Sequence, residues 1–145
     1  MSVNGIPVVT LELKNPLSGQ TAANAIHQYR YDRDPRELIF QFTKRTLVHF
    51  SVDTEEAHVT TRLAGTSTHF LPFNRGNQGG AGNEPDSAGR NYKTAYLWEE
   101  VLSRDSLLDL LARFLHLNSE DKFVWNEFGQ PQAGPKRAAL QILLL

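Results

Sequence analysis

The sequence predicts an α/β fold in which a mixed sheet carries flanking helices and is followed by a helical pair. The apolar, β-branched run at residues 6–11 predicts a buried strand, and residues 21–31 repeat apolar side chains at helical spacing. A strand followed by a helix is half of a βαβ unit. Two later regions support the same class, a hairpin at residues 47–63 and a pair of helices at residues 94–117.

The composition is that of an ordinary soluble globular chain. Its 145 residues suit one domain or one piece of a larger protein, and 40% of them are hydrophobic and 21% charged. The formal net charge of −1 provides no bulk attraction for nucleic acid, and the absence of cysteine excludes disulfides and thiolate zinc sites. No apolar run approaches a membrane span and no signal peptide is evident, so we expect a cytoplasmic protein. Because both ends of the chain lie close to apolar runs, we also expect the chain to be a piece of a longer protein.

The predicted strand at residues 6–11 continues into two charged residues, Glu12 and Lys14, before Pro16 ends it. Residues two apart on a strand point to the same face of the sheet, so we expect the carboxylate and the ammonium side by side. Such a pair can hold a hard cation and position a water molecule beside a phosphate. The alternative, for so short a pattern, is an ion pair at the end of a strand.

The remaining elements are predicted from local patterns. The helix at residues 21–31 is expected to end before Pro35, and Asp105 is expected to cap the second helix of the pair. The other expectations, in chain order, are a short helix or strand at residues 38–42, strands at 47–52 and 57–63, an extended piece at 68–73, helices at 94–102 and 106–117, a strand at 123–125, and a helix that opens at Pro135 and runs to residue 145.

Residues 74–90 form the one compositionally biased stretch, with five of the ten glycines of the chain. It reads as a long exposed loop, a feature that is uncommon without a role. A phosphate-binding loop would need a lysine and a hydroxyl residue at fixed spacing before a helix, and neither is present here. We therefore predict a flexible connector.

Other patterns that carry chemistry are absent or ambiguous. The five histidines do not have the spacing of a zinc hydrolase, and there is no G-x-S-x-G sequence or cysteine nucleophile. Gln28 lies in a polar and aromatic cluster on the predicted helix, a cluster that also fits a solvated helix face with one buried tyrosine. Four cations either line a nucleic-acid path or are scattered surface charge: Arg62, Arg75, Arg90 and Lys93.

Taken together, several stretches between residues 3 and 117 resemble the R (restriction and translocation) subunit of type I restriction endonucleases, in the same order along the chain. The matching stretches are VNGIPVVTLELKNP at 3–16, AIHQYR at 25–30, DRDPRE at 32–37, TTRLAG at 60–65, FLPFN at 70–74, GGAGN at 79–83, YLWEEVL at 96–102 and DSLLD at 105–109.

This resemblance implies a fold and a set of site residues. The N-terminal part of that family is a nuclease of the PD-(D/E)xK fold, with a mixed sheet and flanking helices. By position, Glu12 corresponds to a Mg²⁺ ligand, and Lys14 to the residue that orients the attacking water or stabilises charge on the phosphate. Gln28 corresponds to the glutamine of a Q-x-x-x-Y motif on the following helix. The tyrosine of that motif is replaced by Asp32, and the neighbouring Tyr29 and Tyr31 are candidate substitutes.

The same resemblance implies a function. The reaction would be metal-assisted hydrolysis of unmodified DNA, carried out in a restriction–modification complex with modification and specificity subunits. Mg²⁺ is the implied cofactor. Full-length members also bind ATP in a translocase, whose Walker motif does not occur in this chain.

The chain departs from the family pattern upstream of Glu12. The family places an aspartate on the preceding strand, whereas residues 1–11 contain no Asp or Glu. We therefore expect a truncated core that does not cleave DNA by itself. The predicted organisation is a partial nuclease-like domain at residues 1–73, the glycine-rich loop at 74–93, the helical pair at 94–117 leading toward an absent translocase domain, and a divergent tail at 118–145.

Two alternatives stay open at this stage. The first is a non-catalytic remnant or interaction domain that contacts the modification and specificity subunits or DNA. The second is a different PD-(D/E)xK enzyme such as a repair nuclease, which fits the strand that carries Glu12 and Lys14 but not the later stretches.

Overall fold

A four-stranded mixed sheet forms the centre of the molecule. The computed structural model describes residues 1–85, 89, 92–120, 123–125, 130–133 and 137–142. In the order β3-β4-β5-β6, the first pair of strands is parallel and the other two pairs are antiparallel. The strands are β3 (Val9–Leu13), β4 (Val48–Val52), β5 (Ala57–Thr60) and β6 (Leu71–Pro72). The sheet confirms the predicted α/β class and the predicted hairpin between β4 and β5.

The N-terminal strand differs from the prediction because the chain turns before it enters the sheet. A short hairpin of β1 (Ser2–Val3) and β2 (Ile6–Pro7) comes first, and β3 starts only at Val9. Asn4 and Gly5 both have positive φ, at 50° and 79°, which is the conformation of an Asn-Gly hairpin turn. The ammonium of Met1 donates to the carbonyl of Val9 at 2.6 Å, so the turn brings the N-terminus back onto β3.

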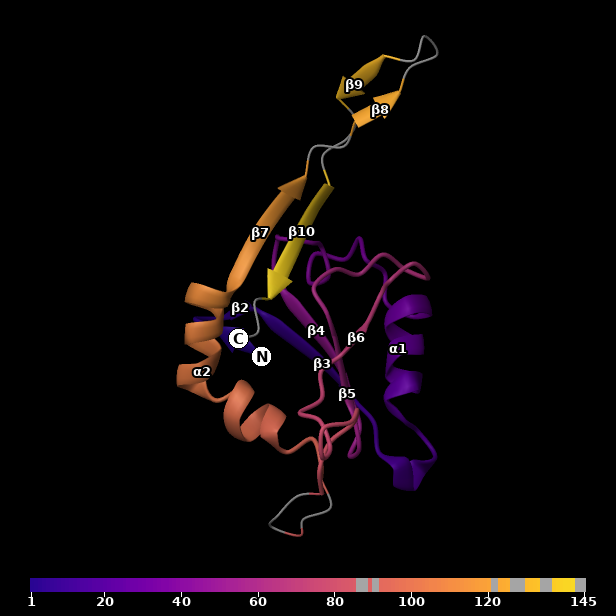
Figure 1. Cartoon of the computed structure of the whole chain (residues 1–145), viewed down its shortest axis with the longest axis vertical. Coiled ribbons are helices and arrows are strands. Elements are labelled where there is room, and N and C mark those ends of the chain that lie inside the picture. The colour runs from indigo at the N-terminus through magenta and orange to yellow at the C-terminus, as the bar shows by residue number, and fades with distance from the viewer. Residues whose placement is uncertain (86–88, 90–91, 121–122, 126–129, 134–136, 143–145) are drawn as a thin grey trace.

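Helix α1 (Ala22–Tyr31) covers one face of the sheet, as predicted (Figure 1). It follows the 3₁₀ turn η1 (Pro16–Ser18) and begins where the Asn24 side chain accepts a hydrogen bond from the backbone N–H of Thr21, at 2.8 Å. Its buried residues recur at helical spacing, which is why this face packs on the strands: Ala22, Ala25 and Tyr29.

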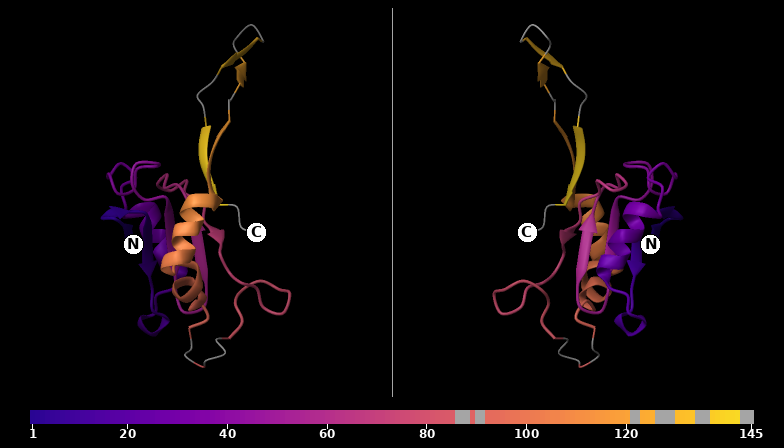
Figure 2. Two further views of the ribbon diagram at one scale, coloured as in Figure 1. Left: turned by 90° about the vertical axis from the view of Figure 1, so that its left-hand side faces the viewer. Right: turned by 90° about the vertical axis from the view of Figure 1, so that its right-hand side faces the viewer.

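A helical segment covers the opposite face of the sheet and confirms the predicted pair (Figures 1 and 2). Its parts are the π-helix η2 (Leu97–Val101), α2 (Arg104–Asp109) and the π-helix η3 (Leu110–Phe114). Ser103, not Asp105, is the N-cap of α2, because the helix starts two residues earlier than predicted. The prediction that helix continues to residue 117 is wrong, because β7 (Leu115–Glu120) begins directly after η3.

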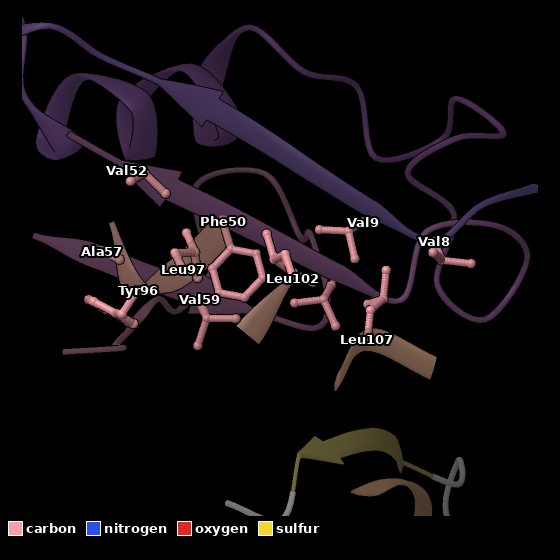
Figure 3. Packing of buried hydrophobic residues seen from close by; sticks show 11 residues of the cluster. Val8, Val9, Phe50, Val52, Ala57, Val59, Tyr96, Leu97, Leu102 and Leu107 are labelled. Atoms are coloured by element: carbon pink, nitrogen blue, oxygen red, sulfur yellow. The ribbon is translucent and has the colours of Figure 1, made fainter. Parts of the chain in front are cut away.

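The main hydrophobic core lies between the sheet and these helices (Figure 3). Val9, Phe50 and Val52 project from the strands, and Leu97 and Leu107 meet them from the helices. Leu97 is fully buried. A smaller cluster on the α1 side joins Tyr29, Phe40 and Leu63. The sheet is therefore covered on both faces, and β4 is buried along its whole length.

The C-terminal region forms two antiparallel strand pairs that extend away from the sheet (Figure 1). Strand β7 pairs with β10 (Arg137–Ile142), and β8 (Phe123–Trp125) pairs with β9 (Pro131–Ala133). The predicted strand at residues 123–125 is confirmed. The predicted helix from Pro135 is wrong over 137–142, where every residue has a partner in β7; Pro135 itself and residues 143–145 lie outside the described residues. A short apolar run does not distinguish a helix from a strand by its periodicity.

Two intermediate segments also depart from the predictions. Residues 38–42 form turns and not a helix or strand, and β5 ends at Thr60 and not at residue 63. No helix in the described part of the chain is long and apolar enough to cross a membrane.

Candidate functional site at the end of strand β3

The three residues singled out from the sequence lie together where β3 ends beside α1. Lys14 donates from Nζ to Oε1 of Gln28 at 2.7 Å. The hydroxyl of Thr10 is hydrogen-bonded to the hydroxyl of Tyr29, which also lies on α1, at 2.9 Å. Thr10 precedes Glu12 by two residues and Lys14 by four. Since alternate residues of a strand share a face, Thr10, Glu12 and Lys14 form the row of β3 that faces α1. The fold therefore brings the predicted residues to one edge of the sheet.

Backbone pairing holds Lys14 in place beyond the end of β3. Its N–H donates to the carbonyl of Val52 at 2.8 Å, which extends the parallel ladder between β3 and β4 by one step. The side chain then reaches Gln28 on α1. Both anchors come from elements with buried faces, so the position of the ammonium is determined by the core and not by a loop.

Arg33 is a residue of this site that the sequence reasoning missed. Its Nε and Nη2 both donate to Oε1 of Glu12, at 2.8 and 2.5 Å. This contact raises the pKa of Arg33, through the hydrogen bonds first and the opposite charge second. Arg33 lies within one of the matching sequence stretches, but no local spacing relates a residue after a helix to a residue on the preceding strand.

A buried polar network lies under the site. Oγ1 of Thr10 bonds both to the hydroxyl of Tyr29 and to Nδ1 of His49, the latter at 2.7 Å. Burial raises the pKa of Tyr29 and lowers the pKa of His49 to about 4, so the imidazole is neutral at physiological pH. Of the two candidate substitutes for the motif tyrosine, Tyr29 belongs to this network, whereas Tyr31 is exposed and stacks on His27.

Asp53 is the carboxylate that follows the neighbouring strand β4, and its role is structural. It is 6% exposed. Oδ2 accepts the N–H of Ala22 at the first turn of α1, and Oδ1 accepts the N–H groups of Glu55 and Glu56 in the turn before β5. Asp53 thus joins the start of α1 to the β4–β5 hairpin, and its oxygens are engaged by backbone donors.

The residues at this site do not by themselves fit a Mg²⁺ ion. Such an ion takes several oxygen ligands, usually including one or two carboxylates. Glu12 is the one carboxylate that the β3 row offers, and Arg33 already holds it. Among the residues that the structure describes, no group of three or more His, Cys, Asp or Glu side chains has the arrangement of a metal site.

The glycine-rich loop is hydrogen-bonded to itself and to the sheet over its described part. Gly76 N–H donates to Gly82 C=O at 2.8 Å, and Asn77 and Gly80 exchange backbone bonds. The buried side chain of Asn83 donates to the carbonyl of Glu55 and accepts from the N–H of Arg75. These N–H groups are used inside the loop, so it is not built as a phosphate cradle.

For two of the four cations, Arg75 and Lys93, acidic partners favour the interpretation as scattered surface charge. Arg75 pairs with Glu100, and Lys93 pairs with Glu55. Both cations line a cleft of about 740 Å³ between the loop and η2, which also contains Glu84, Glu99 and Glu100. Arg62 lies over the ring of Phe42, and Arg90 falls outside the described residues.

Comparison with known proteins supports the family resemblance. Residues 1–68 match the family model described as the N terminus of the type I restriction enzyme R protein. This match confirms the resemblance over the region that contains β3, α1 and β4, and so includes Glu12, Lys14, Gln28 and Arg33. No curated protein and no solved structure matches the chain.

Proposed function

From the match of residues 1–68 to the R protein N terminus, we propose that the chain is the nuclease-like region of a type I restriction enzyme R subunit. In this proposal it acts on DNA within a restriction–modification complex, together with modification and specificity subunits. The observation that carries the proposal is the placement of Glu12, Lys14 and Gln28 at one sheet edge, with Lys14 bonded to Gln28. This placement agrees with the (D/E)xK part of a PD-(D/E)xK site followed by a motif glutamine, although residues 1–11 lack the aspartate of the family pattern.

Each of the three side chains has a distinct role in phosphodiester hydrolysis. Lys14 places positive charge beside the scissile phosphate. Its ammonium donates a hydrogen bond to a phosphate oxygen or to the attacking water. Gln28 accepts from Lys14 and so aims its ammonium. Glu12 contributes a single carboxylate. Mg²⁺, the cofactor of the proposed reaction, needs further oxygen ligands that the described residues do not supply.

We therefore predict that the purified chain alone does not nick supercoiled plasmid in the presence of Mg²⁺ or Mn²⁺. The wild-type chain and the Glu12→Ala variant should both match a no-protein control over the same incubation. Metal-dependent nicking by the wild type that disappears in Glu12→Ala would show that the chain carries a complete site, against this prediction.

The wider proposal is tested in the assembled complex. The chain should co-elute with modification and specificity subunits, and any Mg²⁺-dependent nicking that the assembly performs should be lost in Lys14→Ala. Because the Nζ–Gln28 contact positions the lysine, Gln28→Ala should reduce nicking less than Lys14→Ala. Failure to associate with the subunits and to bind DNA in their presence would refute the proposal.

A second candidate function is a non-catalytic interaction domain of the same complex. It is favoured by the contact of Arg33 with Glu12 and by the backbone bonds of Asp53, because these two carboxylates of the described chain are both already engaged. Under this alternative, Glu12→Ala and Lys14→Ala chains would bind the subunits as the wild type does, and no assembly would show nicking attributable to the chain.

A further inference from the structure

We propose that Arg33 is bound to Glu12 in the free chain and thereby weakens the binding of a divalent cation to this carboxylate. The guanidinium holds Oε1, so Arg33 and a cation compete for the same negative charge. The inference deepens the proposed function and rests on it for the identity of the site. It adds a competing cation to the shortage of oxygen ligands among the described residues at the end of β3.

The geometry of the contact is that of a close ion pair. Two N–H groups of one guanidinium converge on one oxygen, Oε1 of Glu12, at 2.8 and 2.5 Å. The Glu12 side chain is 18% exposed and the Arg33 side chain 39% exposed. A half-buried pair is screened less by water and salt than a surface pair, so the guanidinium is a strong competitor for the carboxylate.

The backbone of Arg33 is tied to the same helix end that positions the motif glutamine. The N–H groups of Asp32 and Arg33 both donate to the carbonyl of Gln28, at 2.8 and 3.1 Å, where α1 ends. The side chain of Gln28 meanwhile accepts from Lys14. Gln28 therefore positions both the ammonium of Lys14, through its side chain, and the backbone of Arg33, through its carbonyl.

The charges around Glu12 show why removal of Arg33 should favour a cation. Lys14 donates to Gln28, and Tyr29 and Asp32 also act electrostatically on Arg33. Without the guanidinium, a half-buried carboxylate would be left without its charge partner, a costly state that a bound cation relieves. The guanidinium of Arg33 therefore competes with a metal ion for the carboxylate of Glu12.

The test is the binding of Mn²⁺ to the full chain, followed by the electron paramagnetic resonance signal of free Mn²⁺ at low salt. Arg33→Gln should bind Mn²⁺ at least tenfold more tightly than the wild type. The double variant Glu12→Gln/Arg33→Gln should lose the gain. An unchanged affinity in Arg33→Gln, or a gain that persists in the double variant, would overturn the inference.

Arg36→Gln is a matched control from the same segment. Arg36 pairs with Asp34 through a bidentate contact on the exposed surface, so its removal also frees one carboxylate. That carboxylate is solvated, and the affinity for Mn²⁺ should change less than twofold. An equal gain in both variants would mean that any freed carboxylate binds Mn²⁺, which contradicts a specific role for Arg33.

Two further measurements keep the test decisive. Far-UV circular dichroism and a thermal transition report whether Arg33→Gln is folded. If it is not, Arg33→Lys keeps the charge but loses the two-donor fork, and its Mn²⁺ affinity should lie above that of the wild type; no gain would overturn the inference. The readout does not depend on the complex or on DNA, so failure of the chain to associate with the subunits and to bind DNA would refute the proposed function and leave this result standing.

Discussion

Replacement of Asp53 by alanine should strongly destabilise the fold, although Asp53 is a carboxylate close to the candidate site. Its side chain accepts three backbone N–H groups, from Ala22 at 2.8 Å, Glu55 at 2.7 Å and Glu56 at 2.9 Å. Two of these bonds form the turn between β4 and β5, and the third satisfies the first turn of α1. Removal of the Asp53 side chain therefore weakens both the start of α1 and the turn between β4 and β5.

The magnitude follows from the burial of the donors. Ala22 is 0% exposed, so water cannot replace the lost acceptor, and an unsatisfied buried donor costs about 1–3 kcal/mol. The two turn donors are partly exposed and add about 0.5–1 kcal/mol each. The sum, about 2–5 kcal/mol, is a large fraction of the stability of a typical domain, which is about 5–15 kcal/mol.

Urea unfolding followed by far-UV circular dichroism measures this change. With an m-value of about 2 kcal/mol/M, the midpoint should fall by roughly 1–2.5 M. Asp53→Asn keeps one acceptor oxygen and should be affected less. Asp34→Ala is the control, because the Asp34 side chain accepts one backbone N–H, from Arg36, at the exposed surface, and its loss should lower the midpoint by less than about 0.5 M. A loss below about 1 kcal/mol in Asp53→Ala would refute the assigned role, since a single buried unpaired donor already costs about that much.

Two other predictions concern the core and the polar network. Burial lowers the pKa of His49 to about 4 from its ordinary value of 6.5, so between these values the unfolded chain binds a proton that the folded chain does not. The free energy of unfolding should therefore fall by about 3 kcal/mol as the pH drops from 6.5 to 4, and His49→Gln should remove this part of the slope in urea titrations at several pH values. Leu97→Ala should cost about 2–5 kcal/mol because Leu97 is 0% exposed, whereas Leu108→Ala, at 41% exposed, should stay within about 0.5 kcal/mol in the same assay. An equal loss in both leucine variants, or a pH slope unchanged by His49→Gln, would contradict these assignments.

Local patterns predicted the parts of the fold that depend on residues close in sequence. The apolar spacing of Ala22, Ala25 and Tyr29 predicted α1, and the β-branched runs predicted β4 and the start of β5. The short apolar runs were predicted less well. Residues 115–117 continue a helical pattern but belong to β7, because pairing with β10 offers them hydrogen bonds that the helix pattern does not reveal.

The same division applies to the candidate site. The two-residue period of a strand places Glu12 and Lys14 on one face whatever surrounds them, so the sequence alone predicted that they are neighbours. Gln28 was identified through the family resemblance. Three contacts could not be predicted from local patterns. Lys14 bonds to Gln28, Arg33 pairs with Glu12, and Asp53 accepts hydrogen bonds from backbone N–H groups.

The sequence by itself therefore determined the class of fold, the position of Glu12 and Lys14 at the end of a strand, and the similarity of residues 1–68 to the N terminus of the type I restriction enzyme R protein. Only the tertiary structure decided which groups those side chains contact. The physical reason is that strand and helix periods act over a few residues, whereas an ion pair such as Arg33–Glu12 joins residues 21 positions apart. Such a contact depends on how α1 crosses the sheet, and this is set by the packing of the whole core.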